Sequence, residues 1–539
     1  MDGRLLTNPE TVLREKFGIR VNLNNPFLHS TRDSCPIQKL PVDILSYLFE
    51  IVADGWRNAT TRHEVLTDEV LDNHKPSCNI SKFMLGALTP WLPVSQVCRY
   101  WHDIAISTPS LWAVIHIPFS TRSRCPPFRC VATQLERSKG FPLDIRINLD
   151  RFCGYPSIFF PMVFNTLLAH IHRWRSIEVQ VAKTEHMYEI LDAISKACIS
   201  TAPQLASVVL ICHGNMLDSS NDYIKSKRFM LFGGSAPHLK TISLIWVNID
   251  WNQLCISSAS NLMTLEINVS NVPSWTQFAT ILRGAPNLQV LVFNDDTWHL
   301  GKDVGWNDLD VGNTHGDNGT DPIRLPKLRQ LHISLPNAMA VQIYRKCHIP
   351  TLKKLTISSY YHNSQEVVDA LVAQLIGPQA VTCPLASKSS EVQLLHTQNQ
   401  SHSLLASVEQ LHINHRFQIW STKHIDSIYC IANQLTSLSL GGPHVPAFID
   451  LLFTPTGQLC DAKLPRLKTL SVSSPIRSSR VRHICALAWH RKDMNIPLRT
   501  IIFMCVWRGT FPKDCLLWFQ ENLETFYCNQ CSYCEHVLG

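Results

Sequence analysis

The chain has 539 residues, of which 45% are hydrophobic and 17% charged, and this composition is typical of folded protein. Its 49 Lys and Arg exceed its 42 Asp and Glu by only seven and form no long basic block, so we expect neither nucleic acid nor an anionic membrane as a partner. No run approaches the roughly 18 apolar residues that span a bilayer, and no secretory leader opens the sequence, so we expect a location in the cytoplasm or nucleus.

The 19 cysteines are scattered singly through apolar runs such as "VVLIC" and "IIFMC". A disulfide framework is favoured in oxidising compartments, which the absent leader argues against. We therefore expect most of these cysteines to be reduced and to act as small buried hydrophobes.

After an N-terminal extension, residues 1–39, the sequence predicts two amphipathic helices. In "LPVDILSYLFEIV", which begins at Leu40, apolar residues recur at helical spacing, and Pro41 stands near the start, where its missing N–H costs nothing. In "VSQVCRYWHDI", Val94, Val97, Cys98, Trp101 and Ile104 fall on one helical stripe. Between the helices, residues 55–89 are predicted to form an inserted polar loop.

This N-terminal region resembles an F-box of the fungal type, on "LP" opening one helix, "VCRYWHDIA" on the next and "TPSLW" before a strand-like "AVIHI". The resemblance covers residues 40–117 and implies a three-helix module that docks on the Skp-type linker subunit of a cullin-RING ubiquitin ligase. The residues it assigns to the linker contact are Leu40, Pro41, Ile44, Leu45, Leu48, Val97, Cys98, Trp101, Leu111 and Trp112. The alternative is that these helices only pack against the repeats downstream.

From residue 170 to 539 the chain repeats a pattern, Pro-x-Leu-x-x-Leu-x-Leu, as in "APQLASVVL", "APNLQVLVF" and "LPRLKTLSV". The last two apolar positions alternate as in a half-buried strand. The spacing resembles that of leucine-rich repeats, which implies an α/β solenoid with a curved parallel sheet and outer helices. The position that usually holds a capping Asn varies here, for example Val247 and Pro336, so the solenoid is expected to be irregular. The alternative is a set of separate α/β domains.

Several segments lie between the predicted strands. "WTQFATILRGAPN" and "SQEVVDALVAQLI" are predicted to be helices of the repeats, while residues 301–322 and 384–403 are predicted to be solvated loops. Residues 118–169 are predicted to be a linking segment between the N-terminal module and the repeats.

No phosphate-binding glycine loop, nucleophile elbow or His-Glu-x-x-His pair is present in the sequence, so we expect no catalysis. The candidate metal ligands are Cys528, Cys531, Cys534 and His536, whose two-residue spacing suits tetrahedral zinc. A structural zinc site usually draws on two well-separated ligand pairs, and Cys528 also occupies the last apolar position of a predicted strand. We therefore expect neither a metal nor another cofactor.

The favoured function is that of a substrate-recognition adaptor, in which the N-terminal module docks on the Skp-type linker and the repeats bind an unidentified protein. It would promote ubiquitination by proximity, without a catalytic residue of its own. The alternatives are a leucine-rich-repeat scaffold unconnected to ubiquitin, and a zinc-dependent or nucleic-acid-binding protein.

Overall fold

The computed structural model describes residues 40–61, 94–118, 127–149, 159–197, 202–213, 228–232, 236–253, 260–268, 272–294, 322–359, 365–377, 403–415, 420–453, 463–474, 477–506 and 511–530. The N-terminal extension and most of the two predicted polar loops lie outside these ranges. Among the helices within them, none has the length and apolar character that a membrane crossing requires.

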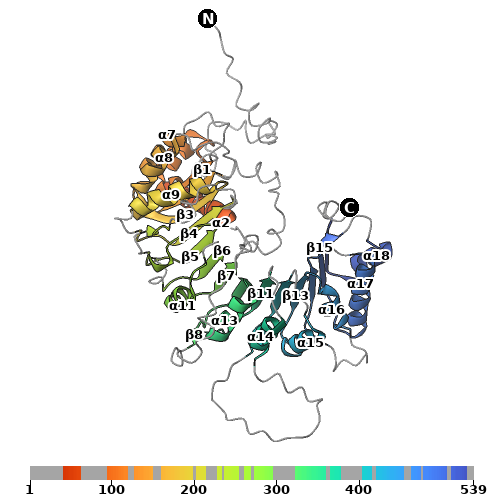
Figure 1. Cartoon of the computed structure of the whole chain (residues 1–539). Coiled ribbons are helices and arrows are strands. Elements are labelled where there is room, and N and C mark those ends of the chain that lie inside the picture. The colour runs from red at the N-terminus through yellow and green to blue at the C-terminus, as the bar shows by residue number, and fades with distance from the viewer. Residues whose placement is uncertain are drawn as a thin grey trace, which may run out of the picture.

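The main sheet contains fourteen parallel strands whose order in space follows their order in the chain (Figure 1). They are β1 (Val114–Pro118), β2 (Leu143–Leu149), β3 (Trp174–Val181), β4 (Ser207–Cys212), β5 (Thr241–Ile245), β6 (Thr264–Asn268), β7 (Val290–Asn294), β9 (Gln330–Ser334), β11 (Lys354–Ser359), β12 (Gln410–His415), β13 (Ser437–Gly441), β14 (Thr469–Val472), β15 (Thr500–Val506) and β16 (Thr525–Gln530). The short strands β8 (Ile323–Arg324) and β10 (Cys347–His348) pair separately. This order is that of a solenoid, in which each unit contacts its neighbours.

Helices cover the outer side of the sheet, while the strands line the inside of the arc (Figure 1). The helices are α7 (Pro127–Arg137), α8 (Phe159–Leu168), α9 (Thr184–Ala197), α11 (Trp275–Gly284), α13 (Asn337–Lys346), α14 (Gln365–Ile376), α15 (Thr422–Ile431), α16 (Val445–Asp450), α17 (Ser478–Asp493) and α18 (Lys513–Asn522). The two helices predicted from the sequence are thus present as α11 and α14. In α11 the start is fixed by a capping box between Ser274 and Gln277.

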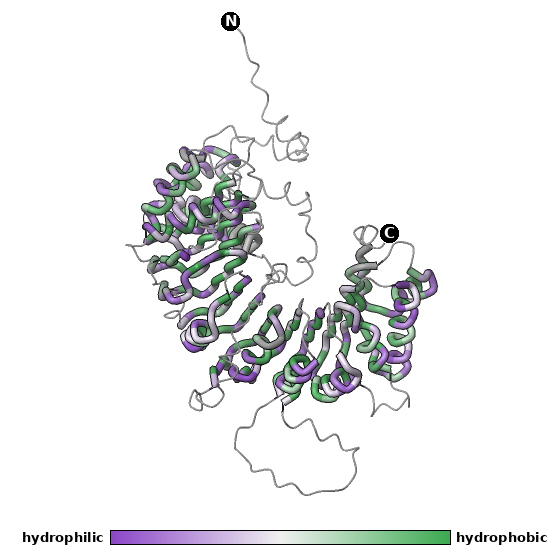
Figure 2. The backbone as a smooth tube through the Cα atoms, in the orientation of Figure 1, coloured by the Kyte–Doolittle hydropathy of each residue, from purple (hydrophilic) through white to green (hydrophobic). Residues whose placement is uncertain are grey.

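The repeated leucine pattern produces this arrangement through a turn and a buried anchor. The N–H of Leu205 donates to the carbonyl of Ala202 at 3.2 Å, and that of Leu239 to Ala236 at 3.1 Å, which are β-turns with proline at the second position. The first apolar residue of every predicted unit is at most 2% exposed: Leu205, Leu239, Leu262, Leu288, Leu328, Leu352, Val408, Leu435, Leu467 and Leu498. These anchors belong to one hydrophobic core that runs from Ala113 to Phe519, and hydrophobic residues recur in each unit along the arc (Figure 2).

The prediction that residues 118–169 form a linking segment is wrong, because the solenoid already begins at β1. The described part of this segment contains α7, β2 and α8. In β2 the residues Leu143, Ile145, Ile147 and Leu149 are buried in the shared core. No Pro-x-Leu turn leads into β2, so the repeat pattern could not identify it.

The N-terminal unit comprises α2 (Val42–Thr61), α5 (Arg99–Ser107) and α6 (Pro109–Trp112), and two details of it differ from the prediction. Residues 55–61, predicted to be loop, continue α2, and the insert from residue 62 to 89 lies outside the described part of the chain. The predicted continuous stripe from Val94 is interrupted, because Cys98 is extended (φ −161°) and caps α5 through its Sγ, which accepts from the Trp101 N–H at 3.5 Å. This break turns Val97 outward, where it is 57% exposed.

Candidate functional site

The three N-terminal helices enclose a small hydrophobic core of their own. It consists of Leu45, Phe49, Val94, Ile104, Ala105, Leu111 and Trp112, with Leu40, Tyr100, Trp101 and Ile106 packed against it. Phe49 and Trp101 meet edge to face with their ring centres 5.1 Å apart. The Trp112 indole N–H donates to the Ala105 carbonyl at 2.8 Å, so the only polar atom of this side chain is satisfied inside the core.

A second apolar stripe on α2 faces solvent. Ile44, Tyr47, Leu48 and Ile51 are 47%, 61%, 40% and 49% exposed, and their spacing places them on one side of the helix, next to the buried stripe of Leu45 and Phe49. We call these four residues the α2 face. A helix that is apolar on two sides but covered on one leaves a surface suited to a protein partner.

The ten residues that the resemblance assigns to the linker divide into three groups. Pro41, Ile44, Leu48 and Val97 are exposed, whereas Leu40, Cys98 and Trp101 are half-buried. Leu45, Leu111 and Trp112 are 0%, 0% and 2% exposed, so their assignment to a partner contact is wrong: they form the core that holds α2, α5 and α6 together. Tyr47 and Ile51, at offsets of three and seven from Ile44, are exposed on the same stripe but are not among these ten residues.

The N-terminal unit is joined to the solenoid through α6. The Arg137 guanidinium of α7 lies 4.3 Å from the centre of the Trp112 ring, in a cation–π contact, and α6 leads directly into β1. A hydrogen bond to Asp144 raises the pKa of Arg175 at β3, and the charge of Asp54 adds to this effect, which places the later turns of α2 near β3. The unit therefore packs against the first units of the solenoid while the α2 face stays exposed.

The inner side of the sheet carries one residue from each strand in register, a set that we call the central row. Its members are His116, Arg146, Glu178, Val209, Ser243, Glu266, Val292, His332, Thr356, His412, Ser439, Ser471, Ile502 and Tyr527. At its N-terminal end Arg146 and Glu178 form an ion pair at 3.3 Å. Further along, Ser243 donates to Glu266 at 2.6 Å.

Two histidines of the central row, His332 and His116, are uncharged at neutral pH. Burial, with a smaller contribution from Lys354, lowers the pKa of His332 to about 3, and burial together with Arg146 lowers that of His116 to about 4. Beyond Glu266 the row contains no Asp, Glu, Lys or Arg, whereas its first part contains paired charges. Such a surface suits contact with a folded protein better than proton transfer, for which a pKa near the working pH is favourable.

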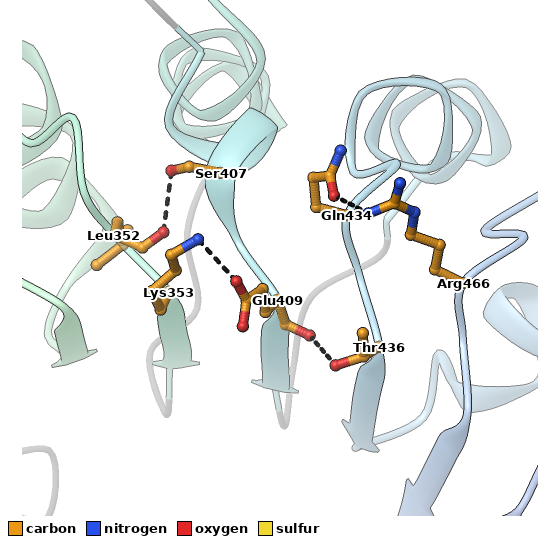
Figure 3. Close-up of polar contacts among 7 residues, drawn as sticks. All are labelled: Leu352, Lys353, Ser407, Glu409, Gln434, Thr436 and Arg466. Carbon is orange, nitrogen blue, oxygen red and sulfur yellow. Dashed lines mark hydrogen bonds and ion pairs between the residues drawn. The ribbon is translucent and has the colours of Figure 1, made fainter.

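The edge where the strands begin is a second polar surface, and its side chains link neighbouring units (Figure 3). The Ser407 hydroxyl donates to the Leu352 carbonyl at 2.9 Å, Lys353 pairs with Glu409 at 2.7 Å, and the Thr436 hydroxyl donates to the Glu409 carbonyl at 3.0 Å. Backbone hydrogen bonds also join each unit to the preceding unit at the point where its strand begins. The edge is thus ordered, and its exposed side chains keep fixed neighbours.

Of the four candidate metal ligands, only Cys528 lies in the described part of the chain. It is half-buried on β16 against the solenoid core, and burial raises the pKa of its thiol. A protonated thiol is a poor metal ligand. Cys531, Cys534 and His536 lie beyond the described residues, and within those residues no group of three potential ligands is placed to hold a metal ion.

Comparison with known proteins leaves the family open. No protein-family model matches the sequence, and no curated protein matches it. The function of the chain must therefore be inferred from its own surfaces, which include the apolar α2 face.

Proposed function

We propose that the N-terminal unit is an F-box-like module that docks on a Skp-type linker of a cullin ubiquitin ligase, and that the solenoid, which resembles leucine-rich repeats, binds the protein to be ubiquitinated. The observation that carries the proposal is the α2 face. Four large apolar residues exposed on one helix of a small module need a partner, because a surface of this kind otherwise favours aggregation.

The module contacts the solenoid with one surface and exposes another, and this arrangement supports the same function. Trp112 and Arg137 attach the module to the solenoid, while the residues of the α2 face are exposed and lie outside the module's core. The alternative, in which these helices only cap the repeats, explains the buried stripe but gives no role to Ile44, Tyr47, Leu48 and Ile51. An interaction scaffold unconnected to ubiquitin would use the same face for a different partner.

The test is a variant in which the α2 face is made acidic, Ile44→Asp with Leu48→Asp. Burying unpaired carboxylates in an interface costs several kcal/mol, and a loss of about 4 kcal/mol weakens binding roughly a thousandfold, so we expect the linker to be lost in co-purification. Both side chains are at least 40% exposed, so the melting temperature of the protein should stay close to that of the wild type.

The matched control is Met162→Asp with Leu517→Asp, because these two residues are also exposed apolar side chains, on α8 and α18 of the solenoid. This control should retain the linker. Absence of the linker from wild-type purifications would sink the ubiquitin-related function, and equal loss from both variants would show that the α2 face has no special role.

A further inference from the structure

Positive charge is segregated in three consecutive units near the middle of the solenoid. Residues 272–294 and 322–359 contain no Asp or Glu, although they carry Arg283, Arg324, Lys327, Arg329, Arg345, Lys346, Lys353 and Lys354. Over the whole chain basic and acidic residues are nearly balanced, 49 against 42. The segment 295–321 between the two ranges carries seven Asp and one Lys, so the continuous stretch 272–359 has nine Lys and Arg against seven Asp, and the excess belongs to the described residues of these units, not to the stretch as a whole.

The fold brings these cations to a single edge of the solenoid. The Lys353 N–H donates to the Arg329 carbonyl at 2.8 Å, so the two residues stand side by side where β9 and β11 begin. Arg324, which precedes Arg329 in the chain, lies opposite His348 in the register of the small sheet of β8 and β10. Lys327 lies between these positions and donates to Asn287 of the preceding unit at 2.7 Å.

Two helices end at the same edge and add further cations. Arg283 lies in the last turn of α11, which contacts β8, and Arg345 lies in the last turn of α13, which contacts β10. The charge of Arg283 is felt at the Cys347 thiol of β10, whose pKa it lowers against the larger opposite effect of burial. Helix C-termini carry partial negative charge, which stabilises cations there.

Six of these side chains are exposed, and we call them the basic edge: Arg283, Arg324, Lys327, Arg329, Arg345 and Lys353. Lys353 is paired with Glu409, which borders the patch, and Lys327 bonds a neutral amide. For the other four, the described part of the chain provides no carboxylate partner within ion-pair distance. Among the described residues, the basic edge therefore presents more positive charge than neighbouring carboxylates compensate, on side chains held by ordered strands and helices.

We propose that the basic edge binds an acidic polypeptide segment of a partner protein. Single-stranded nucleic acid is usually held by exposed aromatic side chains on which bases stack, but Phe278, Phe293 and Tyr344 of this region are buried. Carboxylate side chains of an extended peptide can instead accept charge-assisted hydrogen bonds from guanidinium groups of two neighbouring units of the basic edge. This binding needs neither the α2 face nor a linker, so it stands apart from the proposed ubiquitin-related function.

The experiment measures binding of the full-length protein to a fluorescent oligo-glutamate peptide by anisotropy, at low and at physiological salt. We expect saturable binding that weakens as salt is added, since exposed charges are screened within about 8 Å at 0.15 M ionic strength. The variant Arg324→Glu, Lys327→Glu, Arg329→Glu should bind the peptide at least about tenfold more weakly, because three attractive contacts become repulsive. A neutral oligo-glutamine peptide of the same length should not bind.

The matched control is Lys423→Glu, Lys468→Glu, Lys513→Glu, which makes the same change in net charge at exposed sites of the C-terminal units. Equal weakening by both triple variants would overturn the proposal, since net charge alone would then explain binding. Tighter binding of single-stranded or duplex DNA than of the peptide would also overturn it. Residues 295–321 contain seven aspartates; if the peptide binds only after Asp303, Asp308 and Asp310 are changed to Asn, the chain itself occupies the basic edge and the proposal fails.

Discussion

Leu45 and Leu48 are neighbours on α2, but they meet different surroundings. Leu45 is fully buried between α2, α5 and α6, whereas Leu48 is 40% exposed. The sequence predicts that both lie on apolar stripes of one helix, and it predicts this correctly. It cannot tell which stripe faces α5, because that depends on where the next helix packs, and the break at Cys98 rotates that helix relative to the predicted stripe.

The two leucines therefore predict different effects on stability. Leu45→Ala should destabilise the N-terminal unit by about 2–5 kcal/mol, since it removes buried methyl groups and leaves a cavity, whereas Leu48→Ala should change stability by less than about 0.5 kcal/mol. Hydrogen exchange of the backbone amides in α5 would report the difference, because local opening of this unit becomes more frequent in the first variant. Similar protection of α5 in both variants would contradict the core described for Leu45.

At the scale of the element, the repeat pattern predicts the strands from β4 onward because a leucine-type anchor and an alternating strand recur together, with a proline turn before several of them. β2 and α7 were missed because they lie before the first repeat that the pattern identifies. A further regularity was also missed: small polar residues follow the last apolar residue of several strands in register, including Asn268, Asn294, Ser334 and Ser358, all at most 5% exposed. In the sequence these polar residues stand one position after the last apolar residue of the strand. The capping Asn of a regular leucine-rich repeat is expected three positions after it.

Two glycines next to secondary structure test how tightly the units are joined. Gly442 follows β13 with φ +89°, and a Cβ there would lie 1.9 Å from the His415 carbonyl oxygen of the preceding strand. We expect Gly442→Ala to cost more than about 2 kcal/mol, because backbone strain and a clash with main chain add together.

Gly140→Ala is the matched control for this substitution. No atom lies within 4 Å of a Cβ built at Gly140, so the change should stay within about 1 kcal/mol of the wild type. Melting temperatures of the two variants provide the measurement. If Gly442→Ala melts with the wild type, β12 and β13 can separate more freely than the described register allows.

At the scale of the whole molecule, overall composition and the distribution of charge give different information. The net charge of +7 gave no reason to expect an anionic partner, whereas the fold gathers six exposed cations of residues 283–353 at one edge. Folding brings together Arg283, Arg324 and Arg345, which are far apart in the chain, and no linear motif records such proximity. The solenoid was foreseeable from the repeats and part of the α2 face from the resemblance, but the basic edge emerged only from burial and register.

The continuous core makes a last prediction about truncation. Cutting the chain after Leu440 removes every unit from α16 onward, including Phe448, against which Trp420 and Tyr429 pack and whose carbonyl accepts a hydrogen bond from the Tyr429 hydroxyl at 2.8 Å. It also leaves β13 without β14, so that an apolar edge and a row of unpaired backbone groups become exposed together.

We therefore expect the fragment ending at Leu440 to aggregate or to lose a sharp melting transition, whereas a chain ending at Gln530 keeps every described element and should behave as the wild type. Size-exclusion chromatography and thermal melting followed by circular dichroism distinguish these outcomes. A monomeric Leu440 fragment with a sharp transition would mean that the units fold independently, because contacts between neighbours would then contribute too little free energy for the loss of one side to matter.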